Sequence, residues 1–146
     1  MSVALDTNIL LYAVNSAAQE HGRARSFLEE LVASQELIYL PWPVLFSFMR
    51  IATHPGVFPR PLSYAAVRER IGELLALENV RVLGEEEGFW GIFTEVSDNV
   101  RPTGNLLPDA HIAAILRQNG VRTLYTNDAD FRRFAFLRVL SPFTDR

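Results

Sequence analysis

Three short acidic motifs give this chain the residue types of a divalent-cation site. The motifs are Leu5-Asp6-Thr7-Asn8, Pro108-Asp109-Ala110-His111 and Thr126-Asn127-Asp128-Ala129-Asp130. Apolar runs precede the first and the last motif, which predicts that Asp6 and Asp128 directly follow buried strands. In open α/β sheets, ligands bind at the edge where the parallel strands end. Carboxylate oxygens are typical ligands of Mg²⁺ and Mn²⁺, so the pattern favours metal-assisted hydrolysis of a phosphodiester.

Each motif also has a purely structural explanation when it is taken alone. Asp6 is a good N-cap, Asp109 suits the first turn of a helix, and Asp128 is typical of a turn. The chain has only six aspartates, however, and four of them occupy these positions. Carboxylates gathered at one place repel one another, and a bound cation removes that penalty. Taken together, the motifs therefore favour a metal site.

The elements that must position these motifs follow from hydrophobic periodicity. Strands are predicted up to Leu5, over Leu37–Leu40, Val80–Leu83 and Arg122–Thr126, and over a short fifth segment at 139–140. Segments of helical periodicity separate the strands, over about 23–33, 41–50 and 63–77, and Ser63 is expected to be the N-cap of the third. A further helix is predicted from Pro108, as its first residue, to a C-cap at Asn119-Gly120. Residues 85–87 are predicted to form the acidic first turn of another helix. Strands that alternate with helices predict a mostly parallel sheet covered on both faces, within a single domain, 1–146.

Two further features concern packing. The Pro-rich segment 54–63 is predicted to be a loop, and its Val57 and Phe58 are expected to pack beneath it. Six aromatic residues are expected to lie mostly in the core, with any surplus free to contact a partner. These residues are Trp42, Phe46, Phe48, Phe89, Trp90 and Phe93.

Composition excludes several classes of chemistry. All 14 basic residues are Arg, so any mechanism that needs a lysine is ruled out. Cysteine is absent, which excludes disulfides and thiolate ligands. The net charge is −3, so a nucleic acid would have to be attracted by local arginines and a metal. No apolar run is long enough to suggest a membrane span, and a cytoplasmic location is expected.

The three motifs, in this order and spacing, resemble those of the PIN-domain ribonucleases, and in particular the VapC toxins of toxin–antitoxin pairs. The resemblance spans nearly the whole chain. It implies a three-layer α/β/α sandwich with a four- to five-stranded sheet and a Mg²⁺- or Mn²⁺-dependent endoribonuclease. It also implies a homodimer, an RNA substrate and a small cognate VapB-like antitoxin that covers the active site.

Carried over by position, the resemblance implies a set of metal ligands and a set of pocket residues. The catalytic metal ligands would be Asp6, Asp109 and Asp128, with Asp130 assisting, and the pocket residues would be Asn8 and Thr126. One departure concerns the helix after the second strand, where many family members carry a Glu and this chain has Ser47. The loss of one carboxylate should weaken metal binding or leave a single tight site, and Ser47 could hold a metal-bound water.

Arg50 and Arg132 are candidate contacts to RNA phosphates, because a guanidinium can bind a phosphate with two hydrogen bonds. Both can equally be surface or ion-pair residues. No pattern in the sequence tells which RNA would be cut, or where.

Two other functions compete with the nuclease. With Ser47 in place of Glu, the domain could bind RNA or a protein without cutting. The second is phosphoryl transfer through an aspartyl-phosphate, which also places an Asp after the first strand. That chemistry calls for a second Asp two residues on or for a later lysine, whereas the chain has Asn8 and no lysine.

Overall fold

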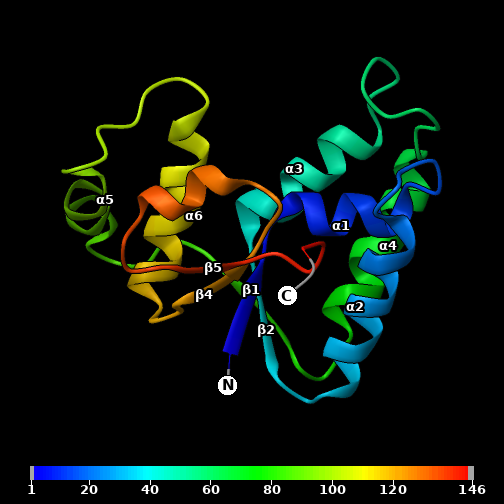
Figure 1. Ribbon diagram of the computed structural model, residues 1–146, viewed down its shortest axis with the longest axis horizontal. Coiled ribbons are helices and arrows are strands. Elements are labelled where there is room, and N and C mark those ends of the chain that lie inside the picture. The colour runs from blue at the N-terminus through cyan, green and yellow to red at the C-terminus, as the bar shows by residue number, and fades with distance from the viewer. Residues whose placement is uncertain (1, 145–146) are drawn as a thin grey trace.

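Five parallel strands form one sheet in the computed structural model, which describes residues 2–144 (Figure 1). The strands are β1 (Ser2–Leu5), β2 (Leu37–Pro41), β3 (Val80–Leu83), β4 (Thr123–Tyr125) and β5 (Arg138–Leu140). Their order across the sheet is β3-β2-β1-β4-β5, and each neighbouring pair is parallel. The five predicted strands and the parallel sheet are therefore confirmed.

Helices cover both faces of this sheet. They are α1 (Thr7–Val14), α2 (His21–Ala33), α3 (Trp42–Ala52), α4 (Tyr64–Leu75), α5 (Phe89–Ser97), α6 (Leu106–Gln118) and the short 3₁₀ helix η1 (Ala129–Arg133). In Figure 1, α5 and α6 lie on one side of the strands and α1, α2 and α4 on the other, which confirms the layered α/β architecture. None of the helices in the described residues is long and apolar enough to cross a membrane.

The strand order reverses beside β1, and this reversal positions the site. The chain moves from β1 outward to β2 and β3, and then returns through α5 and α6 to β4 on the other side of β1. Leu5 of β1 is paired with Tyr125 of β4, so the next residues, Asp6 and Thr126, leave the sheet side by side. This is the place where open α/β sheets bind ligands.

Most helix ends lie close to their predicted positions. The Ser63 hydroxyl accepts a hydrogen bond from the Ala66 N–H and caps α4 as predicted. After α6, the N–H groups of Gly120 and Val121 donate to the carbonyls of Arg117 and Leu116, which is the Schellman pattern of a glycine C-cap. Gly120 has a φ of +73°, a conformation that favours glycine.

Two predicted helix starts are wrong. Pro108 is the third residue of α6, not its first, because the helix begins at Leu106. A proline is still tolerated there, since the N–H groups of a first turn have no partner within the helix. Residues 85–87 precede α5 and do not form its first turn, because Gly88, with a φ of +80°, is the N-cap.

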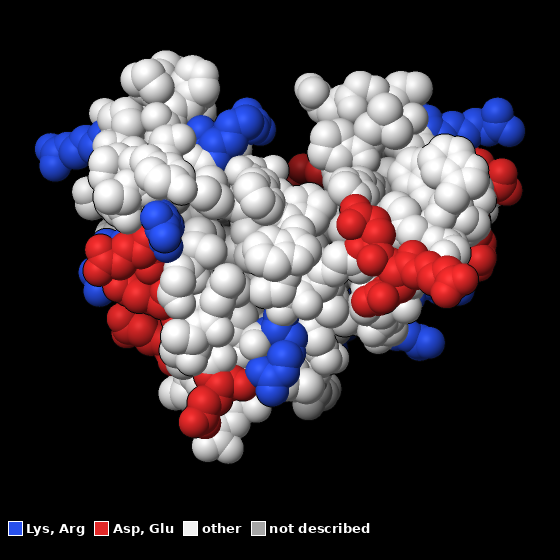
Figure 2. Space-filling view, turned by 180° about the vertical axis from the view of Figure 1, so that it is seen from behind, with Lys and Arg blue, Asp and Glu red and all other residues white. Residues whose placement is uncertain are grey.

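The core lies between the sheet and its helices, and the predicted set of core aromatics is only partly right. Phe48 is fully buried, and Phe58 is buried beneath its loop as predicted, but Val57 of that loop is exposed. Trp42, Phe46 and Trp90 are 44%, 62% and 73% exposed, so a core location was wrong for these three. Figure 2 shows that uncharged side chains cover much of one face, which is notched between two lobes.

The glycine C-cap of α6 can be tested by comparing Gly120 with Gly72, a glycine inside α4. Gly72 lies within α4 with open space around its Cα, so Gly72→Ala should stabilise the protein by about 0.5–1 kcal/mol. Gly120 has equal space but a positive φ, so Gly120→Ala should destabilise it by about 1 kcal/mol. Thermal unfolding should show melting temperatures shifted in opposite directions by about 3–5 °C. Equal shifts in the same direction would contradict the capping role of Gly120.

Candidate metal centre

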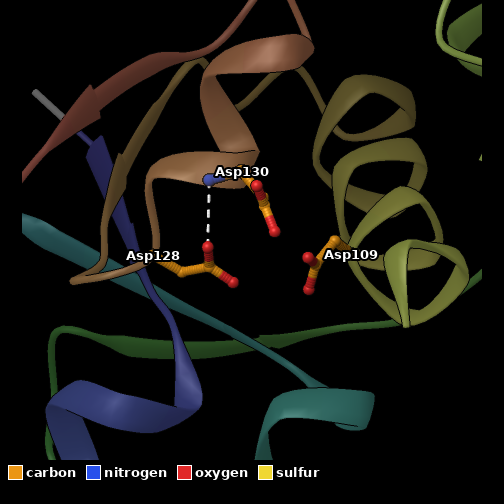
Figure 3. Close-up of side chains that lie close together, drawn as sticks. All are labelled: Asp109, Asp128 and Asp130. Carbon is orange, nitrogen blue, oxygen red and sulfur yellow. Dashed lines mark hydrogen bonds between the residues drawn. The ribbon is translucent and has the colours of Figure 1, made fainter.

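Three carboxylates converge at the carboxyl edge of the sheet (Figure 3). One oxygen from each of Asp109, Asp128 and Asp130 lies within 4.8 Å of the others. Asp109 comes from the first turn of α6, while Asp128 and Asp130 come from the N-cap and the first turn of η1. The Asp130 N–H donates to Asp128 Oδ1 at 2.9 Å, which fixes the Asp128 carboxylate with its other oxygen free to face the cluster.

Asp6 lies beside this cluster and is almost completely buried. Its Oδ1 accepts a hydrogen bond from the Thr7 N–H at 2.7 Å, so Asp6 does act as the N-cap of α1. Its Oδ2 accepts from the Thr126 hydroxyl at 2.7 Å and from Asn8 Nδ2 at 3.2 Å. The structural and the functional interpretations of Asp6 are therefore compatible, because the capped carboxylate still lies close enough to Asp109 and Asp128 for their charges to interact.

Asn8 and Thr126 also hold the loop that carries Asp128. The Thr126 hydroxyl accepts from the Asp128 N–H at 3.0 Å and from Asn8 Nδ2 at 3.1 Å. Asn8 Oδ1 accepts from the Asn127 N–H at 3.1 Å. Thr126 is only 2% exposed, so its hydroxyl has exchanged water for these protein partners. The two side chains predicted to shape the pocket, Asn8 and Thr126, thus link Asp6, which follows β1, to Asp128, which follows β4.

The electrostatic cost of this arrangement falls on Asp109 and Asp6. Burial, together with the charges of Asp128, Asp6 and Asp130, raises the pKa of Asp109 to about 7. Burial also raises the pKa of Asp6, and this effect outweighs the hydrogen bonds from Thr126 and Thr7 that lower it. The clustered carboxylates therefore repel one another, and binding of protons relieves this repulsion where no cation does so.

The donor set of the cluster fits a hard divalent cation. Its ligand atoms are carboxylate oxygens, which suit Mg²⁺ and Mn²⁺ better than the softer metals that prefer nitrogen or sulfur. A cation would also remove the repulsion that raises the pKa of Asp109. The acidic cluster is thus a candidate metal site, because it offers suitable ligand atoms and negative charge that a cation would neutralise.

Within residues 2–144, the remaining predicted site residues make no hydrogen bond to the cluster. Ser47 is half-buried on α3, and Arg50 is exposed in the last turn of the same helix. Arg132 is exposed on η1, two residues after Asp130. His111, in the second acidic motif, contacts the Glu85 carboxylate through its Nε2, and this contact lowers the pKa of Glu85.

One contact at the site was not predicted from the sequence. Asn127 Nδ2 donates to the Tyr12 hydroxyl at 3.3 Å, beside the candidate ligand Asp128. Asn127 belongs to the last acidic motif, and its place between Thr126 and Asp128 was a signal that it borders the site. Its partner lies 115 positions earlier in the chain, so no local pattern could identify the pair.

Comparison with known sequences identifies relatives over the full length. The PIN domain profile matches residues 3–137. Ribonuclease VapC48 of Mycobacterium tuberculosis is 38% identical over 144 residues, which cover 99% of each chain. Ribonuclease VapC43 of the same species is 34% identical over 138 residues, 94% of this chain and 93% of the relative.

Solved structures share the fold. A toxin–antitoxin complex from Klebsiella pneumoniae contains a chain that superposes with a TM-score of 0.63 at 19% identity, covering 97% of this chain and 98% of the other. The fold, the acidic cluster and the similarity to relatives over the full length all indicate the same family. This chain therefore belongs to the PIN-domain family and, within it, to the VapC ribonucleases.

Proposed function

We propose that this chain is a Mg²⁺- or Mn²⁺-dependent endoribonuclease that hydrolyses RNA phosphodiester bonds as the toxin of a toxin–antitoxin pair. The observation that carries the proposal is the convergence of Asp109, Asp128 and Asp130 at the reversal point of the sheet, with Asp6 beside them. The names of its full-length relatives as ribonucleases support the same activity.

In this proposal Asp109, Asp128 and Asp130 hold the cation. Asp6 completes the ligand set, because its Oδ1 accepts only one hydrogen bond from the described residues and its charge acts on Asp109. The bound metal supplies activation of water and stabilisation of the charge that develops on the phosphate. The chain's own part is to hold these carboxylates ionised and fixed, which the hydrogen bond to Thr126 favours.

Three further residues complete the proposed substrate site. Arg50 and Arg132 are exposed cations, and we assign them to contacts with RNA phosphates. Ser47 occupies the position where many family members carry a Glu, and we propose that its hydroxyl would hold a water bound to the metal. With one carboxylate fewer, the site should bind the metal less tightly than a site that has the Glu.

We also propose a VapB-like antitoxin and a second copy of this chain as partners, in the cytoplasm. The exposed aromatics Trp42, Phe46 and Trp90 support a protein interface, because large apolar groups in contact with water favour association. The Klebsiella pneumoniae relative in fold is described as a toxin–antitoxin complex, which supports an antitoxin. An apolar groove among α1, α2, α3 and α4 offers a binding surface for it, lined among others by Leu10, Val14, Leu28, Val32, Phe48 and Leu74.

Purified protein should cleave cellular RNA into discrete fragments with Mg²⁺ or Mn²⁺ and should not do so with EDTA. Asp109→Asn should reduce the rate by at least about 100-fold, because the substitution removes a metal ligand and its charge. The matched control is Asp98→Asn, which changes an exposed aspartate on α5's C-cap and should leave the rate unchanged. Fragment yields on a sequencing gel give both rates.

Cleavage that persists in EDTA, or that survives Asp109→Asn, would contradict the proposed mechanism. A wild type that binds RNA but leaves it intact with either metal would favour the alternative, a binding module without catalysis.

The pKa of Asp109 predicts how stability depends on pH without metal. Folded protein keeps a proton on Asp109 between 3.8, the value of an ordinary aspartate, and about 7. The stability from this group is complete below that window and is lost as the pH rises through about 7. Asp109→Asn removes this pH-dependent loss of stability, because asparagine does not ionise. At about pH 8 in EDTA the variant should exceed the wild type by about 1–2 kcal/mol, allowing for solvent screening.

The measurement is thermal unfolding of both proteins at about pH 5 and about pH 8. The advantage of the variant should grow with pH and should reverse when Mn²⁺ is added, because the cation stabilises only a folded state that binds it. A difference between the proteins that stays constant with pH would show that Asp109 has an ordinary pKa.

Thr126 offers a test of how the site is positioned. Thr126→Val removes the donor to Asp6 and the acceptor for the Asp128 N–H, and should weaken Mn²⁺ binding by about 10- to 100-fold in a calorimetric titration. Thr126→Ser keeps the hydroxyl and should bind Mn²⁺ almost as the wild type does. Equal affinities for the Val and Ser variants would rule out a positioning role for the hydroxyl.

A further inference from the structure

Asn127 borders the candidate metal centre and is held in place through its backbone. It lies between Thr126, which is bonded to Asp6, and the candidate ligand Asp128. The Asn127 N–H donates to Asn8 Oδ1 at 3.1 Å, and the next N–H, of Asp128, donates to the Thr126 hydroxyl at 3.0 Å. The main chain at Asn127 is therefore fixed, although its side chain is exposed to solvent.

The Asn127 side chain is oriented by a contact with α1. Its Nδ2 donates to the Tyr12 hydroxyl at 3.3 Å. The Tyr12 ring packs edge-on against Phe143, with ring centroids 5.1 Å apart, and the Tyr12 carbonyl accepts from His21 Nδ1 at 2.8 Å. With Nδ2 engaged, Asn127 Oδ1 is left as the open atom of the amide, since no residue within 2–144 donates to it.

This oxygen is an uncharged hydrogen-bond acceptor on the residue that directly precedes the candidate ligand Asp128. Phosphate oxygens are themselves acceptors and carry negative charge, so Asn127 Oδ1 has no attraction for them. Along the sugar–phosphate backbone of RNA, the 2′-hydroxyl is the group that can donate. It sits on the carbon next to the one that carries the 3′ phosphate oxygen, whereas the donors of a base lie beyond the glycosidic bond.

We propose that Asn127 Oδ1 accepts a hydrogen bond from the ribose 2′-hydroxyl of a nucleotide adjoining the scissile phosphate, so that the Tyr12–Asn127 pair selects RNA over DNA. The inference rests on the proposed nuclease activity and assigns to it a residue that reads the sugar. In the proposed function the acidic cluster acts on the phosphate, which RNA and DNA share, so the cluster alone would not distinguish them, whereas an acceptor for the 2′-hydroxyl would.

The test uses a short RNA that the wild type cleaves at one position. Three versions are compared: all ribose, a single 2′-deoxy nucleotide on the 5′ side of the cut, and one on the 3′ side. One of the two substitutions should slow the wild type by about 3- to 10-fold, the effect of one exposed hydrogen bond. Asn127→Ala should cleave the all-ribose RNA more slowly by a similar factor and lose its sensitivity to that substitution, as in a double-mutant cycle.

Two further variants sharpen the result. Tyr12→Phe keeps the ring but removes the hydroxyl that orients the amide, so its sensitivity to the 2′-deoxy substitution should fall between those of the wild type and Asn127→Ala. Asn99→Ala removes an exposed amide from the α5–α6 loop and should behave as the wild type. The shift of melting temperature with Mn²⁺ should be the same in all four proteins, because none of these changes removes a carboxylate or a hydrogen bond that positions one.

The outcomes separate this inference from the proposed function. Normal cleavage by Asn127→Ala, with the same sensitivity to 2′-deoxy substitution as the wild type, would overturn the role of Asn127 and leave the nuclease intact. Absence of cleavage of the all-ribose RNA by the wild type would overturn both. A changed Mn²⁺ response in Asn127→Ala would show that the residue acts on the metal site and not on the sugar.

Discussion

The hydrogen bond between the Thr126 hydroxyl and Asp6 Oδ2 joins two parts of the chain that are 120 residues apart. It exists because β1 and β4 are neighbours in parallel register, so that Asp6 and Thr126 leave the sheet together. The same hydroxyl accepts the Asp128 N–H, so one buried oxygen sets the distance between the first and the last acidic motif. Asp130 depends on this link as well, because it lies in the first turn of η1, whose N-cap is Asp128.

The geometry that gathers the carboxylates also makes them costly in the absence of a cation. Burial and three neighbouring charges raise the pKa of Asp109 to about 7, so near neutral pH the metal-free site is partly protonated. Binding of a cation would release that proton and remove the repulsion, so metal affinity and stability are coupled to pH through the same residue. If the proposed cation binds here, the site is an element of the fold that its ligand completes, and it need not be the most stable part of the molecule.

Local patterns predicted the parts of the structure that local interactions determine. The Ser63 cap and the Asn119-Gly120 C-cap depend on a few neighbouring residues, and both are present. Apolar runs that end in acidic motifs likewise placed Asp6 and Asp128 at strand ends. The exposure of Trp90 and the contact between Tyr12 and Asn127 depend on packing between distant segments, which periodicity does not encode. The late start of α5 followed from Gly88, whose positive φ outweighed the acidic residues before it.

The most direct test of the metal centre is the anomalous diffraction of crystals soaked in Mn²⁺. The arrangement of the carboxylates predicts a peak enclosed by Asp109, Asp128 and Asp130, and no peak at this place in crystals of Asp109→Asn. A peak held by other groups would contradict the account. So would an empty cluster at a Mn²⁺ concentration that supports cleavage of RNA.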